Sequence, residues 1–302
     1  MRNYRIPARL NIAIATVQLL AMLALLWGAG RVTTWWAVTL LALGYGVIMN
    51  SAFAMLHEAT HGILHPRRGV NDMVGTILAL FFPAPYHLIR QGHIGHQVRN
   101  RSDDEAFDLY FEGENRFWKG LLLYGTLTGL FWVVIFLTNL FVLLCPSLTM
   151  PARINRTAEA FLESFHPRYR RLVQGEALAV ILLHLGLVWM WRIPLSHYLA
   201  VMFGFGFIWS AMQYVHHYGT ERDVLKGARN LRTFRLLDWI WLNHNWHRNH
   251  HSQPTVPWLY LPQLGDPAEP RGRLLSAYFT MWQGLRPATE HVENRFAGKI
   301  IQ

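Results

Sequence analysis

Four long apolar runs, which together contain a single charged residue, constrain the fold of this chain more than any other feature. They cover 10–29 and 35–56, which lie close together in the sequence, and 172–191 and 197–215, which also form a close pair. Each run has about 20 residues, the length that a helix needs to cross a bilayer. Charged residues make up only 15% of the chain, against about 25% in an average soluble protein. The sequence therefore predicts an all-α, polytopic membrane protein.

Lysine and arginine residues flank the apolar runs, as is typical of membrane proteins whose basic segments stay in the cytoplasm. The basic segment 1–9 and the arginine-rich segment 146–171 are therefore expected on one side. This requires the apolar stretch 120–145 to dip into the membrane and return, because a crossing would place the arginines outside. We predict four transmembrane helices in two hairpins, one re-entrant or interfacial element, and a cytoplasmic histidine-rich cap on the inner (cytoplasmic) membrane. The net charge of +10 then reflects topology, and we expect no binding of nucleic acid.

The chain has a single cysteine, Cys145. A disulfide framework needs at least two cysteines. A protein-held iron–sulfur cluster or a cysteine-rich zinc site needs several thiolates. Any metal bound by this chain must therefore be held by imidazole and oxygen.

Histidines occur in three tight groups. Segments this rich in imidazole are poor core material, because each ring carries two polar nitrogens that need partners when buried. The groups are His57-Glu58-Ala59-Thr60-His61, His93-Ile94-Gly95-His96-Gln97 and His247-Arg248-Asn249-His250-His251. A pair, His216-His217, follows the last apolar run, and the hairpin topology brings all four features to one membrane face. One zinc ion takes three or four ligands, so this number of histidines suits two ions better than one. Imidazole with few carboxylates suits iron, and two irons beside lipid suggest the activation of O₂ against an unactivated C–H bond.

Other interpretations of these residues stay open. The pattern His57-Glu58-x-x-His61 is also the signature of zinc metalloproteases, in which two histidines bind zinc and the glutamate is the general base. An intramembrane zinc metalloprotease is therefore the alternative from a different class, although it leaves the other histidines unexplained. A non-catalytic lipid-binding protein is a third interpretation.

Taken together, the motifs resemble those of the integral-membrane fatty acid desaturase and hydroxylase superfamily, whose members carry three histidine boxes separated by helical hairpins. The first two groups resemble the first two boxes, with Asn100 and the acidic run 103–108 downstream of the second. The third resembles the last box, which starts at Asn245 and runs on into Pro257-Trp258 and Leu261-Pro262. The resemblance covers roughly residues 35–262, within one membrane-embedded domain over 1–302.

The resemblance implies a dinuclear non-haem iron centre, O₂ as co-substrate and a long-chain fatty acyl lipid as substrate. The metal ligands that it implies are His57, His61, His93, His96, His216, His247, His250 and His251. Electrons would come from a separate carrier protein, such as a ferredoxin, a rubredoxin or a cytochrome, because no segment resembles such a domain. We expect a fatty acid desaturase, and a hydroxylase, a ketolase or an oxidative decarboxylase on the same scaffold is the alternative.

Some positions near the boxes carry further expectations. The second box of the superfamily usually ends in two histidines, whereas here the last position is Gln97, which offers an amide oxygen as a ligand or a hydrogen bond. His244 is a candidate to take the place of the missing imidazole, and His217 is the alternative to His216. Candidates for contacts that orient ligand imidazoles are Glu58, Asp104 and Asn245, followed by Asp223 and Asp238.

Overall fold

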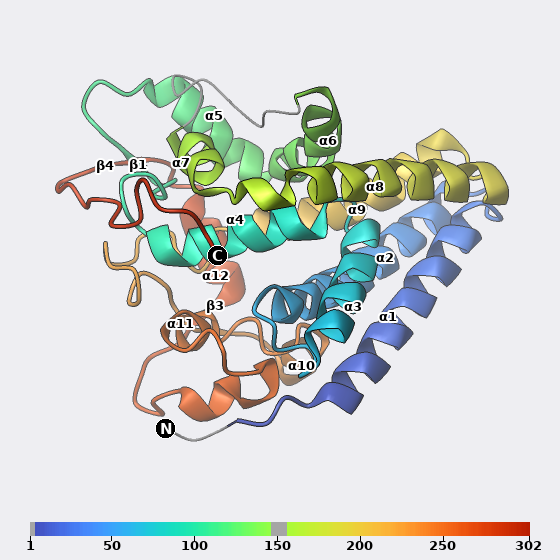
Figure 1. Cartoon of the computed structure of the whole chain (residues 1–302), viewed down its shortest axis with the longest axis horizontal. Helices are drawn as coiled ribbons and strands as arrows, with labels where there is room; N and C mark the ends of the chain where they lie inside the picture. Colours follow the sequence, from blue (N-terminus) through green and yellow to red (C-terminus); the bar gives the residue numbers. More distant parts are fainter. Residues whose placement is uncertain (1–3, 146–155) are drawn as a thin grey trace.

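The chain folds into helices whose four longest members coincide with the four apolar runs (Figure 1). The structure, a computed structural model, describes residues 4–145 and 156–302. Long and apolar enough to cross a membrane are α1 (Ala8–Ala29), α2 (Trp35–Thr60), α8 (Arg170–Trp191, preceded by the 3₁₀ turn η1, Pro167–Tyr169) and α9 (Leu195–Met212). These four helices match the predicted apolar runs, and the last of them ends three residues earlier than its run. The structure has up to six candidate spans if each of two bent helix pairs also crosses the membrane.

Helix α1 shows why these helices belong in lipid. Its buried positions recur every three or four residues and form one narrow stripe, which is the face that a helix turns toward its neighbours. They are Asn11, Ala15, Gln18, Met22, Leu26 and Ala29. The opposite face is equally apolar but exposed, with Val17 at 65% and Leu20 at 61% exposure. A soluble protein would place polar residues there, so lipid is the natural surrounding of this face.

The two pairs of long helices form hairpins whose turns meet at one end of the molecule, at the right of Figure 1. The guanidinium of Arg31, in the first turn, donates to the carbonyl of Trp191 over 3.4 Å. From the second hairpin, the Nδ1 atom of His197 lies 2.9 Å from the carbonyl oxygen of Ala29. Because both turns lie at this end, the starts of α1 and α8 and the ends of α2 and α9 lie toward the other end.

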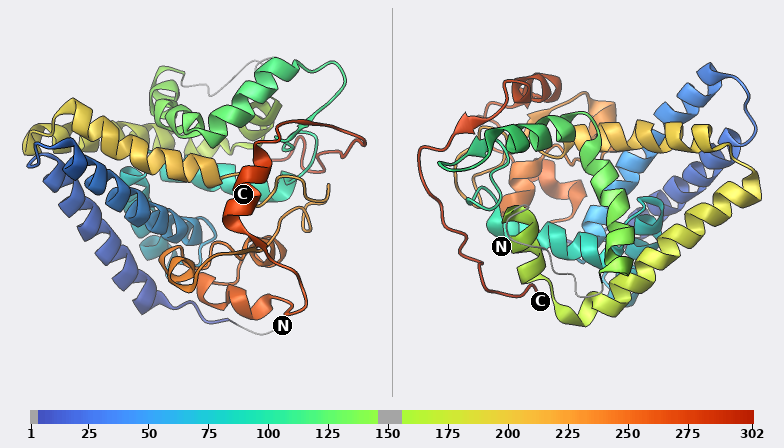
Figure 2. Two further views of the ribbon diagram at one scale, coloured as in Figure 1. Left: turned by 180° about the vertical axis from the view of Figure 1, so that it is seen from behind. Right: turned by 90° about the horizontal axis from the view of Figure 1, so that it is seen from above.

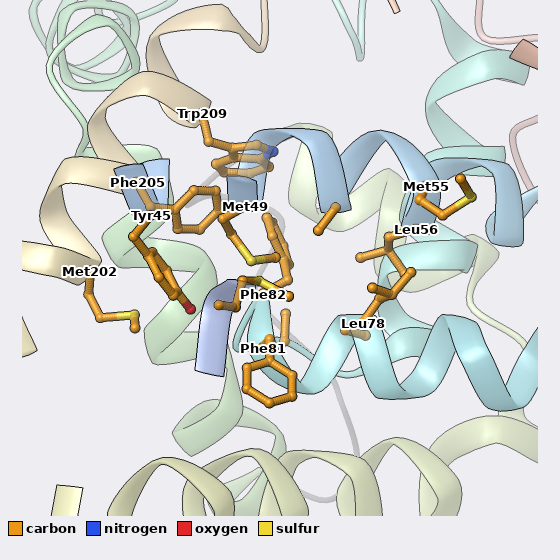
Figure 3. Close-up of a cluster of buried hydrophobic side chains, with 14 of the residues drawn as sticks. Tyr45, Met49, Met55, Leu56, Leu78, Phe81, Phe82, Met202, Phe205 and Trp209 are labelled. Carbon is orange, nitrogen blue, oxygen red and sulfur yellow. The ribbon is translucent and has the colours of Figure 1, made fainter. Parts of the chain in front are cut away.

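Small residues let α2 and α9 approach each other closely, as is common between membrane helices. A Cβ atom added at Gly204 of α9 would lie 3.0 Å from the Cβ atom of Ala42 of α2. Toward the histidines, large apolar side chains pack between α2, α3 (Arg68–Phe81) and α9. Figure 3 shows Met49, Phe82 and Trp209 among them, pointing toward one another.

Two pairs of shorter helices are sharply bent. The axes of α3 and α4 (Tyr86–Arg99) differ by 99°, and those of α5 (Arg116–Leu127) and α6 (Leu130–Leu144) by 96°. The stretch 120–145 is therefore not one straight helix, because it breaks at Gly129, whose φ of 99° suits a residue without a side chain. Such a bend fits either a re-entrant element or a broken span. The first ten residues of the arginine-rich segment, 146–155, lie outside the described residues, and α7 (Arg156–Ser164) follows them.

The short elements of the second half gather at the end opposite the two turns, as both panels of Figure 2 show. We call this part of the molecule the histidine end. Its helices are α10 (Arg235–Ile240), α11 (His247–Ser252), the 3₁₀ helix η2 (Trp258–Leu264) and α12 (Leu274–Met281). Its strands form two parallel pairs, β1 (Leu109–Tyr110) with β4 (Arg286–Pro287) and β2 (Leu231–Arg232) with β3 (Gly272–Arg273). These two-residue strands are the only departure from all-α structure in the described part of the chain.

Candidate metal centre

Eight histidines converge into two clusters at the histidine end, each with four ring nitrogens that lie within 4.8 Å of one another. In the first cluster the Nε2 atoms of His61 and His93 are 2.7 Å apart. In the second cluster the Nε2 atom of His247 lies 3.0 Å from that of His217 and 3.1 Å from that of His251. The first cluster consists of His57, His61, His93 and His250, and the second of His96, His217, His247 and His251.

The clusters cut across the sequence groups. His57 and His61, one helical turn apart at the end of α2, both belong to the first cluster. Helix α4 instead gives His93 to the first cluster and His96 to the second, and α11 divides its three histidines in the same way. The rings of His93 and His96 are 6.2 Å apart. Two helices therefore hold both clusters at a fixed separation.

The donor atoms fit two metal ions. Ligand nitrogens around one ion at about 2.1 Å lie at most about 4.2 Å apart, close to the spread of each cluster. The Nε2 atom of His57 is buried and has no hydrogen-bond partner in the described part of the chain. A bound cation would satisfy this nitrogen, whereas a metal-free core would leave it unpaired at a cost in free energy.

Burial keeps these imidazoles in the neutral form that binds metal. It lowers the pKa of His61 to about 3. Burial, together with the neighbouring imidazoles, also lowers the pKa of His247, His250 and His251 well below the usual range. At neutral pH these four rings therefore offer lone pairs to a metal ion and carry no positive charge.

The expected preference for His216 over His217 does not match the structure, which brings His217 into the second cluster. The ring of His216 lies beside that of His247, with 4.6 Å between the ring centroids. Its Nδ1 atom lies 3.1 Å from the carbonyl oxygen of Arg229. The helical period does not continue to these residues, because α9 ends at Met212, so the sequence could not indicate which of the two turns inward.

Two acceptors outside the second cluster orient its rings. The Nδ1 atom of His96 donates to the carboxylate of Glu105 over 3.2 Å. That of His217 donates to the carbonyl of Gly227 over 2.8 Å. We expected Asp104 in such a role, but its carboxylate accepts from Asn294 and pairs with Arg156. The acidic run marked the right segment, and only the fold shows which of its members faces a histidine.

Within the described residues, the other candidates for orienting contacts make no hydrogen bond to an imidazole. Glu58 accepts from the backbone N–H of Trp258 over 2.9 Å. The amide of Asn245 donates to Asp238 and to the carbonyl of Leu231, both over 2.9 Å. The carboxylate of Asp223 accepts from backbone N–H groups of the turn that ends at Gly227. They position backbone segments that carry or support the ligands.

Trp258 attaches the third histidine group to the membrane helices. Its side chain is 1% exposed. Its backbone N–H binds Glu58 of α2, and its indole N–H donates to Asn11 of α1 over 3.0 Å. The carbonyl of Trp258 accepts from the side chain of Asn243, just before the third group. Trp258, which the sequence marked only as part of a motif, therefore fixes α11 against α1 and α2.

Asp108 supports the segment after α9 that carries His217. The carboxylate is completely buried and pairs with Arg101 and Arg286. It also accepts from the hydroxyl of Tyr214 over 2.7 Å and from the backbone N–H of Gly219 over 2.9 Å. Burial alone would raise the pKa of Asp108, but Arg101 and these hydrogen bonds bring it below the usual value. A charged Asp108 therefore holds the chain on both sides of His217.

Gln97 and His244 lie at the first cluster in different ways. The side-chain nitrogen of Gln97 is 2.6 Å from the Nε2 atom of His250. His244 belongs to neither cluster. Its ring centroid is 5.0 Å from that of His57 and 5.3 Å from that of His247. It therefore does not take the place of the imidazole that Gln97 replaces.

Comparison with known proteins agrees with this site. The sequence profile of the family described as "Fatty acid desaturase" matches residues 33–283, most of the chain. No curated protein sequence matches the chain. The matched region contains all eight clustered histidines and the four long apolar helices. The chain therefore belongs to the fatty acid desaturase family.

Proposed function

We propose that this protein is a membrane-embedded oxidoreductase that uses two iron ions and O₂ to desaturate a long-chain fatty acyl lipid. The observation that carries the proposal is the pair of four-histidine clusters at one end of four apolar helices. Membership of the fatty acid desaturase family supports iron as the metal and a lipid as the substrate. Among the reactions that such a centre could carry out, we propose desaturation.

Each cluster would hold one iron ion through its four imidazoles, and Gln97 and His244 lie beside them. When bound, the two irons supply the activation of O₂ needed to remove hydrogen from an unactivated C–H bond. The burial of the ligands excludes water from the reacting carbon, and Glu105 and Gly227 fix two of the rings. O₂ takes four electrons in all, two from the acyl chain and two from an external donor, and leaves as two water molecules.

An aromatic group next to the clusters supports an acyl chain as substrate. The rings of Phe53, Phe82 and Trp209 contact one another, with centroids 4.9–5.4 Å apart. The ring of His244 lies 6.3 Å from Phe53 and 5.0 Å from His57. Apolar side chains therefore pack against the metal centre on its membrane side, and an acyl chain would approach the centre from that side. The carbon that is attacked would be set by the depth to which that chain reaches.

The same arrangement supports a topology. We place the histidine end on the cytoplasmic face of an inner membrane, with two hairpins and the bent α5–α6 pair as a re-entrant element. Arg5 and Arg9 lie at the start of α1, where the ring of Tyr4 lies 5.1 Å from that of Tyr260 at the histidine end, which agrees with the distribution of charge in membrane proteins. The electron donor would be a separate ferredoxin, rubredoxin or cytochrome-type protein that docks there. Labelling of residues in 156–171 from the outside of intact cells would contradict this orientation.

A zinc protease is less well supported than an oxidoreductase because of the position of Glu58. A general base must point at the water on the metal, whereas Glu58 accepts from the backbone of Trp258. The protease interpretation predicts that Glu58→Gln abolishes activity, while the four histidines of the second cluster are dispensable because zinc needs only one ligand besides His57 and His61. The oxidoreductase interpretation predicts a weakened but active Glu58→Gln variant and an inactive variant with His251→Ala, in the second cluster.

The test is a mass-spectrometric comparison of lipids from cells that express wild type or His250→Ala. The proposal predicts an acyl product two mass units lighter than its precursor in the wild type alone. A product heavier by sixteen units would replace desaturation by hydroxylation on the same scaffold. Identical lipids in both strains, with a reducing partner and O₂ present, would contradict an oxidoreductase acting on lipids.

A further inference from the structure

The two histidine clusters differ in what surrounds them. In the second cluster, His96 and His217 donate their Nδ1 protons to Glu105 and Gly227. Within residues 4–145 and 156–302, no ring of the first cluster has such an acceptor outside the cluster. The Nδ1 atoms of His250 in the first cluster and of His247 in the second are both buried without a partner there, so the difference lies in the two oriented rings. Hydrogen bonds of this kind make a ligand imidazole more basic, so these two contacts favour tighter metal binding at the second cluster.

The first cluster has an amide instead. The side-chain nitrogen of Gln97, on α4, lies 2.6 Å from the Nε2 atom of His250 and 3.4 Å from that of His61. Both nitrogens belong to the set that converges on the first site. The amide of Gln97 is therefore directed at the position of the metal and not at solvent or backbone.

A bound ion would reverse the orientation of this amide. With no ion present, the NH₂ group can donate to a ring nitrogen that has a free lone pair. Once His61 and His250 direct their lone pairs at a cation, no acceptor remains for the NH₂ group, and its positive end faces positive charge. The nitrogen and oxygen of an amide have nearly the same shape, so a half-turn about the last side-chain bond puts the carbonyl oxygen in this place.

We propose that Gln97 gives its amide oxygen as a fifth ligand to the ion held by His57, His61, His93 and His250. The two metal sites then differ in coordination number and in affinity. One has four nitrogens and one oxygen and binds metal more weakly, and the other has four nitrogens with two oriented rings. The proposal rests on the metal-binding part of the proposed function and not on the reaction.

Cobalt(II) titration of the purified, metal-free, full-length protein tests this, because the visible absorption of cobalt(II) is stronger with four ligands than with five. We expect two binding steps in the wild type, the weaker one with weak absorption. Gln97→Leu should weaken that step by about tenfold, as loss of a supporting contact does at metal sites, and strengthen its absorption. Gln253→Leu, at an exposed glutamine close to His250, is the control and should match the wild type.

Gln97→Glu keeps an oxygen at the same place and provides an independent test if Gln97→Leu does not fold. We expect it to tighten the weaker step and to keep the five-ligand absorption of the wild type. A weaker step that already absorbs strongly in the wild type, or that Gln97→Leu leaves unchanged, would overturn the role of Gln97. A wild type that binds no cobalt at all would instead overturn the metal centre itself.

Discussion

Replacing Asp108 by asparagine removes one negative charge and almost no volume. The change leaves Arg101, which is 1% exposed, without its ionised partner. Breaking a buried ion pair from one side costs about 3–5 kcal/mol, because the other charge stays buried and uncompensated. This corresponds to a roughly 10²- to 10⁴-fold shift of the folding equilibrium toward the unfolded state. We therefore expect Asp108→Asn to unfold at a clearly lower denaturant concentration than the wild type.

The loss should be greatest where Asp108 acts, in the segment around His217. Denaturant unfolding in detergent, followed by tryptophan fluorescence, measures the stability, and metal analysis at low denaturant measures the second site. Glu112→Gln is the matched control, since it removes the same charge from an exposed side chain. Unfolding of Asp108→Asn at the wild-type midpoint, with full metal content, would refute the inference that the buried carboxylate holds this segment.

Three further predictions concern the surroundings of the site. Burial lowers the pKa of His244 to about 4, against about 6.5 when unfolded, so the unfolded chain binds the extra proton first. As the pH falls below 6.5, the free energy of unfolding of the metal-free protein should fall by up to about 1.4 kcal/mol per pH unit for each such histidine. A melting temperature that is equal at pH 7.5 and pH 5.5 would contradict this. Glu105→Gln should weaken metal binding at the second cluster by about 10- to 100-fold. A competition titration with a chelator measures this affinity, and an unchanged affinity would exclude a role of Glu105 in orienting His96. Trp258→Phe should lower the free energy of unfolding by about 1–3 kcal/mol, because it leaves the buried side chain of Asn11 without its indole donor. If the segment 243–262 of this variant resists proteolysis as well as that of the wild type, Trp258 does not anchor it.

The sequence predicted the helices and the histidines well because both depend on local patterns. The four long helices follow from apolar runs, and those runs fix their limits to within a few residues. Seven of the eight clustered histidines were predicted because they stand in tight groups, which are recognisable without a fold. The charge argument predicted that 120–145 does not cross the membrane as one straight helix, but no local pattern placed the break at Gly129.

What the sequence could not predict depends on the direction of side chains after the fold has formed. The division of α4 and α11 between two clusters needs the relative rotation of those helices. His217 and Glu105 were passed over for their neighbours His216 and Asp104, because a shift of one residue changes which side chain faces inward. The anchoring of Trp258 by Glu58 joins residues 200 positions apart. No local pattern reports such a contact.

The central claim, that eight histidines hold two iron ions, is tested most directly by counting metal in the purified full-length protein. Plasma emission spectrometry of protein expressed with ample iron should give about two irons per chain in the wild type. His61→Ala, in the first cluster, and His251→Ala, in the second, should each lower this to about one. One zinc ion per chain that depends on His61 and not on His251, or no bound metal at all, would contradict the claim.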